Sequence, residues 1–206
     1  MKALITGGSR GIGKSIALYF ATKGIEVIIP TREELNLNDP SLIKSYISSL
    51  SSVNILINNA GVNNIQNIEE VEYNNLLETF NINFFSPYLL CSALLPKFKK
   101  QNYGRIINIS SIWSTNVKDK RSTYAASKAA IHNLTKQLVP ETKNHNILSN
   151  TISPGYISTD LTYQNNTPED INTIEQTIPL NRMGTPEEIA KLAYYLSVEN
   201  SYINGQ

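Results

Sequence analysis

The sequence predicts an α/β fold, a single Rossmann-type, doubly wound parallel sheet with helices on both faces. Short apolar runs alternate with longer segments of helical periodicity, and this alternation is typical of parallel strands joined by crossover helices. The apolar runs lie at residues 3–5, 27–29, 53–57, 106–109 and 147–152. With 206 residues, 41% of them hydrophobic, the chain suits one core, and no repeat or linker divides residues 1–206 into two domains.

Two parts of the chain depart from regular alternation. Only a few residues separate the second apolar run from residues 35–39, although a parallel crossover normally needs a dozen or more. We therefore expect a shortened connection without a helix between strands 2 and 3, with residues 35–39 forming a very short or irregular strand. Pro140 falls within the helical pattern that begins near Tyr124, and it predicts a kink or an early end of that helix.

The first apolar run leads into the glycine-rich turn Thr-Gly-Gly-Ser-Arg-Gly-Ile-Gly at residues 6–13, which is followed by a helical pattern. This order of strand, turn and helix is typical of a dinucleotide-binding site. We expect Gly7 to permit the tight turn, Gly11 to let the backbone approach a pyrophosphate, and Gly13 to allow close helix packing. Thr6 is expected to fix the turn.

A second motif places Tyr124 and Lys128 four residues apart, so that both project from one face of a helix. The ammonium is expected to favour the phenolate and to lower the pKa of Tyr124, which could then exchange protons near neutral pH. Ser111 follows a buried strand, at the edge where open α/β sheets place their sites. A hydroxyl there can hold a carbonyl oxygen, and Ser110 is the rival of Ser111 for that role.

Together with Asn-Asn-Ala-Gly at residues 58–61 and Ser-Pro-Gly-Tyr-Ile-Ser-Thr at residues 153–159, these motifs resemble the short-chain dehydrogenase/reductase family over nearly the whole chain. The 3-oxoacyl carrier-protein reductase branch is the most similar. The resemblance implies an oxidoreductase that interconverts a carbonyl and a secondary alcohol, with Tyr124 as general acid/base.

Within that resemblance, the thirteen-residue spacing to Tyr124 favours Ser111 as the residue that stabilises the oxyanion, and Ser110 has a supporting role. Lys128 also holds the nicotinamide ribose. Asn83 matches an asparagine that joins a water-mediated proton relay to the lysine. Pro87 has no amide hydrogen for the carbonyl of residue 83, so that carbonyl could stay free for a water.

The resemblance also implies a set of cofactor-binding residues. Residues 59–61 would line the adenosine ribose, and Thr159 would bond the nicotinamide carboxamide. The full set comprises Thr6, Gly7, Ser9, Arg10, Gly11, Ile12, Gly13, Arg32, Asn59, Ala60, Gly61, Tyr124, Lys128, Pro154, Gly155, Ile157 and Thr159.

The second strand ends without the carboxylate that usually binds the ribose hydroxyls of NAD. Arg32, with Arg10, could instead grip a 2′-phosphate, which favours NADP(H) as the cofactor. Glu33 and Glu34 lie close by and leave NAD(H) possible. Trp113 and Tyr156 are candidates for the wall of the substrate site, with core packing as the competing explanation, and residues 161–178 for a mobile cover over it.

Composition argues against several other classes. A net charge of +1 offers no general attraction for nucleic acid or anionic membranes, and the histidines have no partners at metal-ligand spacing, so no metal site is expected. Residues 84–95 are too short and too interrupted to span a bilayer. The single cysteine suits a reducing compartment, so we expect a cytoplasmic protein acting on a small-molecule carbonyl or alcohol.

The sequence stops at Gln206, where the resembled family continues through one more strand, so we expect an incomplete chain or an exposed sheet edge. That strand commonly contributes to subunit packing in the family, and a homo-oligomer is expected. Three alternatives stay open beside the 3-oxoacyl reductase. They are a sugar or polyol reductase, a nucleotide-sugar epimerase or dehydratase, and a cofactor-sensing protein without turnover.

Overall fold

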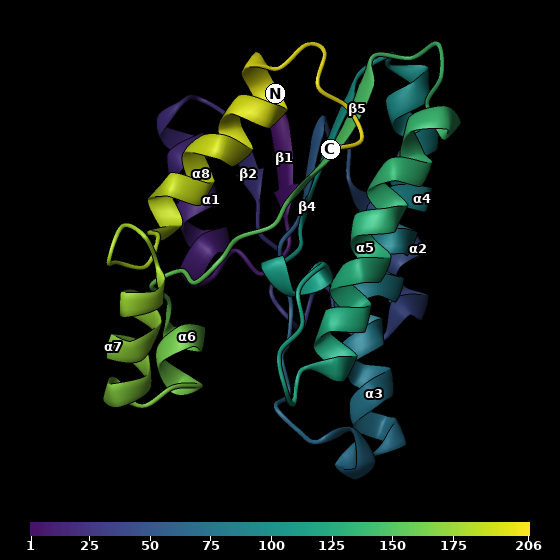
Figure 1. The fold of residues 1–206 in the computed structure, drawn as a ribbon. Coiled ribbons are helices and arrows are strands. Elements are labelled where there is room, and N and C mark those ends of the chain that lie inside the picture. The colour runs from purple at the N-terminus through teal and green to yellow at the C-terminus, as the bar shows by residue number, and fades with distance from the viewer.

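A five-stranded parallel sheet in the order β2-β1-β3-β4-β5 organises the computed structural model, which describes residues 1–206 (Figure 1). The strands are β1 (Lys2–Ile5), β2 (Glu26–Ile28), β3 (Ile55–Asn58), β4 (Gly104–Ile109) and β5 (Ile147–Ile152). All four pairings are parallel, which confirms the predicted fold class. Crossing from β1 to β3 reverses the strand order, and open sheets bind ligands at such a point.

Helices cover both faces of the sheet (Figure 1). One face carries α1 (Gly11–Thr22) and α8 (Pro186–Tyr194). The other carries α2 (Ile43–Ser49), α4 (Ser86–Lys100) and α5 (Ser122–Glu141). Three further helices lie beyond the carboxyl ends of the strands, namely α3 (Tyr73–Phe80), α6 (Asp160–Gln164) and α7 (Pro168–Thr177).

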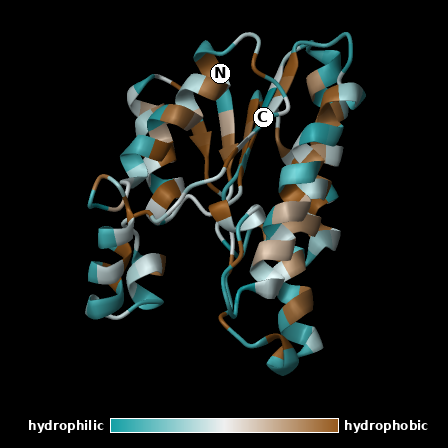
Figure 2. Ribbon diagram, in the orientation of Figure 1, coloured by the Kyte–Doolittle hydropathy of each residue, from teal (hydrophilic) through white to brown (hydrophobic).

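Two apolar clusters hold these layers together, one on each face of the sheet. Successive strand residues point to opposite faces, so Leu4 packs with α2, α4 and α5, whereas Ala3 and Ile5 pack with α1 and α8. Figure 2 shows the strands as mostly hydrophobic and the outer helix surfaces as mostly hydrophilic. The core therefore leaves only the loops at the strand ends to form a site.

Residues 35–39 form no strand, so the strand expected there is wrong, and the chain instead reaches β3 through α2. Leu35 is buried in the apolar core, which anchors the segment without a strand. Two side chains from a helix far along the chain hold it in place. The Asn81 amide donates to the Asn38 carbonyl at 3.1 Å, and the Ser86 hydroxyl donates to the Leu37 carbonyl at 2.7 Å.

The helix that begins before Tyr124 ends early, as Pro140 predicts, because α5 stops one residue later, at Glu141. The last residues lie beside β5. There the Gly205 amide donates to the Ser149 carbonyl at 2.7 Å, and the Thr151 amide donates to the Gln206 carbonyl at 2.6 Å. No helix combines the length and the apolar character that crossing a bilayer requires.

Candidate active site

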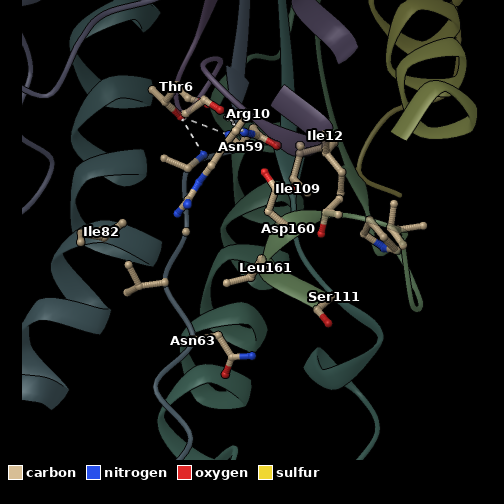
Figure 3. Close-up of a pocket in the computed structure, with 18 of the residues that line it drawn as sticks. Thr6, Arg10, Ile12, Asn59, Asn63, Ile82, Ile109, Ser111, Asp160 and Leu161 are labelled. Carbon is tan, nitrogen blue, oxygen red and sulfur yellow. Dashed lines mark hydrogen bonds between the residues drawn. The ribbon is translucent and has the colours of Figure 1, made fainter. Parts of the chain in front are cut away.

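A cavity of about 590 Å³ opens at the carboxyl ends of the strands. That volume is within the range of small-molecule sites. Figure 3 shows Thr6, Arg10 and Asn59 at one end, which we call the glycine-turn end, and Ser111 at the opposite end, which we call the tyrosine end because Tyr124 also lines it. Asp160 and Leu161 lie between the two ends.

Side-chain hydrogen bonds fix the glycine-turn end from within the protein. The Thr6 hydroxyl donates to the Ile57 carbonyl at 3.4 Å and accepts from the amides of Asn59 and Ala60 at 3.1 and 3.2 Å. The Asn59 side chain donates to the Thr6 and Gly7 carbonyls at 3.0 and 3.1 Å (Figure 3). The loops after β1 and β3 are therefore joined, and Thr6 occupies the role in the turn that its sequence position predicts.

The glycines of this turn meet distinct requirements. Gly11 has φ +54°, in the left-handed region that side chains rarely adopt, and it opens α1. A Cβ atom at Gly13 would come within 2.3 Å of both the Asn59 amide nitrogen and the Gly7 carbonyl oxygen. Gly13 therefore lies behind the turn, where close packing of helix on loop excludes any side chain.

The donors at the glycine-turn end fit an anionic dinucleotide. The first turn of α1 carries no acidic side chain and its N-cap, Arg10, makes no capping bond, so the free amides face the cavity with their positive dipole end. Arg10 and Arg32 both line the cavity, and neither forms an ion pair. The Glu34 carboxylate accepts from the Thr31 amide at 2.8 Å and does not line the cavity.

The cavity brings nearly all of the predicted residues together. Gly13 and Asn83 are the exceptions, because each lies directly behind a lining residue. The predicted residues that line it are Thr6, Gly7, Ser9, Arg10, Gly11, Ile12, Arg32, Asn59, Ala60, Gly61, Ser111, Tyr124, Lys128, Pro154, Gly155, Ile157 and Thr159.

At the tyrosine end, the electrostatic prediction for Tyr124 is wrong in this structure. Burial raises the pKa of the Tyr124 phenol above its usual value, and hydrogen bonding with Ser111 and the charge of Arg121 lower it only in part. The desolvation of a half-enclosed phenol therefore outweighs the attraction expected from the sequence spacing.

Lys128 is itself deeply buried, with its Nζ atom 5.7 Å from the centre of the Tyr124 ring. Its ammonium donates to the Ile109 carbonyl at 2.8 Å, and burial lowers its pKa to about 8. The Ser110 hydroxyl donates to the Lys128 carbonyl at 2.9 Å. The last residue of β4 and the residue after it therefore hold the lysine by its head group and by its backbone.

Asn83 lies in a π-helical turn, η3 (Asn81–Phe85), that joins α3 to α4. Pro87 follows at the start of α4 and cannot donate to the turn before it, which accounts for the break from α-helical geometry. The Asn83 side chain accepts from the Val62 amide at 2.9 Å and donates to the Val62 carbonyl and the Ser127 hydroxyl at 2.9 and 3.0 Å. It therefore fastens the loop after Gly61 to α5.

The wall of the tyrosine end includes an aromatic pair that the sequence indicated and a cation that it did not. Trp113 and Tyr156 form an edge-to-face pair with ring centres 6.1 Å apart, and both line the cavity. Arg121 also lines the cavity and is buried at the start of α5. A cation one helical turn before Tyr124 was the available signal, because residues three apart share a helix face.

The predicted cover is built of two short helices, α6 and α7, and four of its residues line the cavity: Leu161, Thr162, Asn165 and Asn166. The Thr162 hydroxyl donates to the Ile157 carbonyl at 2.6 Å, which attaches α6 to the loop carrying Thr159. A capping box between Thr167 and Asp170 starts α7. Few other side-chain bonds join this segment to the sheet, so its position depends on that loop.

Comparison with known proteins agrees with this geometry. A family profile described as enoyl-(acyl carrier protein) reductase matches residues 38–206. The 3-oxoacyl-(acyl-carrier-protein) reductase FabG of Vibrio cholerae is 34% identical over 230 residues, covering 99% of this chain and 93% of its own length. Among solved structures, Thermoplasma acidophilum aldohexose dehydrogenase superposes with a TM-score of 0.91 at 26% identity, covering 99% of this chain and 89% of its own. The structure of ElxO with NADP bound superposes with a TM-score of 0.89 at 26% identity, covering 99% of this chain and 94% of its own.

Proposed function

Because the chain belongs to the short-chain dehydrogenase/reductase family of oxidoreductases, we propose that it is an NADP(H)-dependent reductase of a ketone or 3-oxoacyl compound. One observation carries the proposal. A hydroxyl pair, Ser111 and Tyr124, shares a single cavity with a turn whose free amides and guanidinium groups suit a dinucleotide phosphate. A nicotinamide cofactor bound there would supply the hydride.

The side chains of the tyrosine end divide the remaining work. Tyr124 donates its phenolic proton to the carbonyl oxygen, and Ser111 donates a hydrogen bond to the same oxygen as negative charge develops on it. The pKa of the Tyr124 phenol is raised by burial, so the proton that reduction requires is present on this side chain. Lys128 places a positive charge beside that phenol at pH values below about 8.

Asn83 acts as a positioning residue in this proposal. Its three hydrogen bonds hold the loop after Gly61 against α5, and the side chain lies next to the Lys128 ammonium at the back of Gly61. A water held by this π-helical turn would complete a proton path to Lys128. The relay that the family resemblance implies therefore stays a proposal about this chain.

The substrate class is proposed from the relatives. FabG relatives named as 3-oxoacyl reductases favour a 3-oxoacyl compound, and the aldohexose dehydrogenase of similar fold supports a sugar as the second candidate. Purified protein should consume NADPH with at least one member of a panel that holds 3-oxoacyl thioesters, 3-oxo esters, aldohexoses and polyol-derived ketones. A cofactor-binding protein that consumes no NADPH with any of them would instead be the sensing protein.

We also propose that the protein is cytoplasmic, since its lone thiol, Cys91, is free and buried. We propose a homo-oligomer because α3, η3 and α4 expose apolar side chains. These exposed side chains are Tyr73, Leu76, Leu77, Phe85, Tyr88 and Leu89. Light scattering after size exclusion should give a mass of at least two chains. A single-chain mass at micromolar concentration would contradict this assembly.

A further inference from the structure

Arg121 is a buried cation for which the protein supplies no partner. Its side chain is only 7% exposed, and the Nε and Nη1 atoms are both buried without a hydrogen-bond partner. A buried guanidinium without compensation is costly, so such groups are normally paired. The fold does not account for this cost, because only the backbone of Arg121 takes part in starting α5, where its carbonyl accepts from the Ala125 amide.

The surroundings of Arg121 place it at the tyrosine end of the cavity. It lines the cavity together with Ser111, Tyr124 and Tyr156, and its charge acts on both phenols. Asp119 and Glu69 share a smaller surface cavity with Arg121, but neither lies within ion-pair distance. The two ion pairs of the structure lie elsewhere, between Lys2 and Glu26 and between Arg182 and Glu188.

Two other cations near this end are already engaged. The Lys118 ammonium donates to the Tyr156 hydroxyl at 2.8 Å and does not line the cavity. Lys128 donates to the Ile109 carbonyl. A single guanidinium with free donors is therefore available to the substrate, which matches a group of one negative charge better than a doubly charged phosphate. The planar fork of arginine suits a carboxylate in particular.

Resting on the reductase function proposed above, we propose that the substrate is a short oxo acid whose carboxylate binds Arg121 while its carbonyl oxygen lies between Ser111 and Tyr124. Arg121 precedes Tyr124 by one helical turn, a rise of about 5 Å. A carboxylate and a carbonyl separated by one or two carbon atoms span a comparable distance. A 3-oxo or 4-oxo acid with a free carboxylate is therefore the expected substrate, rather than a thioester, whose carboxyl group carries no charge.

The test compares 3-oxobutanoate with its methyl ester, which has the same carbonyl but no charge, in NADPH-dependent reduction. The wild-type protein should have the higher kcat/KM for the acid. R121Q should lower kcat/KM for the acid by about 10- to 100-fold, the value of a charge-assisted hydrogen bond. The kcat/KM for the ester should fall far less, because the ester is affected only through the influence of Arg121 on Tyr124. R121K should retain part of the preference, because it keeps the charge without the fork.

K120Q is the matched control. It removes the same charge from the neighbouring residue, whose side chain does not line the cavity. K120Q should leave kcat/KM unchanged for both the acid and the ester. The inference is overturned if the wild-type protein reduces the ester at least as well as the acid. The inference is also overturned if R121Q lowers kcat/KM equally for the acid and the ester, since that result indicates a structural role for Arg121.

Trp113 gives a readout that does not depend on turnover, because it is the single tryptophan and it lines the same end of the cavity. Butanoate should change its fluorescence on binding, methyl butanoate much less, and R121Q should abolish the response to butanoate. Reduction of neutral carbonyls without any response to butanoate would overturn the anion site alone. Binding of butanoate through Arg121 without reduction of any carbonyl would overturn the reductase and leave the anion site standing.

Discussion

The two ends of the cavity differ in how completely the protein satisfies their polar groups. At the glycine-turn end, Thr6 and Asn59 make five hydrogen bonds that join the loops after β1 and β3. At the tyrosine end, Arg121 keeps two buried nitrogen atoms without partners. The difference indicates that the glycine-turn end offers its free donors from a backbone that internal hydrogen bonds hold rigid, whereas the tyrosine end offers a free donor on a buried side chain.

The largest expected effect tests whether the tyrosine end performs the chemistry. Y124F removes the proton donor and should lower kcat by about 10²- to 10⁴-fold. Y156F removes a hydroxyl from the same wall and should lower kcat by less than about tenfold, because that phenol accepts a bond from Lys118 and has no role in proton transfer. Both are measured by NADPH consumption at saturating substrate, with circular dichroism to confirm folding. Equal losses in the two variants would remove Tyr124 from the mechanism.

The second prediction concerns the guanidinium group of Arg32 at the glycine-turn end. R32Q should lower kcat/KM for NADPH by about 10- to 100-fold, the value of hydrogen bonds to a charged phosphate. The value for NADH in the same variant is the internal control and should change little. Wild-type protein that uses NADH as well as NADPH would contradict the proposed cofactor preference.

The third prediction tests the rigidity of the glycine-turn end. G13A places a methyl group 2.3 Å from the Asn59 amide and should lower the free energy of unfolding by about 1–3 kcal/mol or more. G155A is the control, because a Cβ atom there meets nothing within 4 Å. Urea unfolding followed by circular dichroism measures both. A G13A variant as stable as G155A would show that the glycine-turn end can rearrange to accommodate a methyl group, and would contradict its proposed rigidity.

The smallest effect concerns pH. Lys128 has its pKa lowered to about 8 by burial, so kcat/KM for NADPH should fall about tenfold per pH unit above that value as the ammonium is lost. In K128R the charge persists, and the residual activity should lack this limb. The limb assigned to Lys128 would be wrong if K128R kept it.

Stability should change in the opposite direction over the same range. Between pH 8 and 10.5 the unfolded chain holds the Lys128 proton and the folded chain does not, so the contribution of this group to stability rises with pH. That rise should be absent in K128M. Urea titrations at several pH values measure it.

The fold and the glycine turn could be predicted because their requirements leave marks in the sequence. A left-handed φ at Gly11 and the absence of space at Gly13 each require glycine, and apolar runs identify buried strands. The raised pKa of Tyr124 could not be predicted, because burial of the phenol in the folded chain outweighs the effects that lower it, and burial leaves no mark in the Tyr-x-x-x-Lys spacing. The role of Asn81 could not be predicted either, because its bond to Asn38 joins residues 43 positions apart in the chain.

The π-helical turn at Asn81–Phe85 carries two asparagines whose side chains bond to two different loops. Asn81 holds Asn38 and its loop, which line the cavity, and Asn83 holds the loop beside Lys128. A dinucleotide that orders the first loop would therefore also order the second, two residues away along the same helix. We expect an ordered sequential mechanism, in which the nucleotide binds before the carbonyl compound. The loop beside Lys128 would be ordered for the carbonyl compound only once the nucleotide is bound.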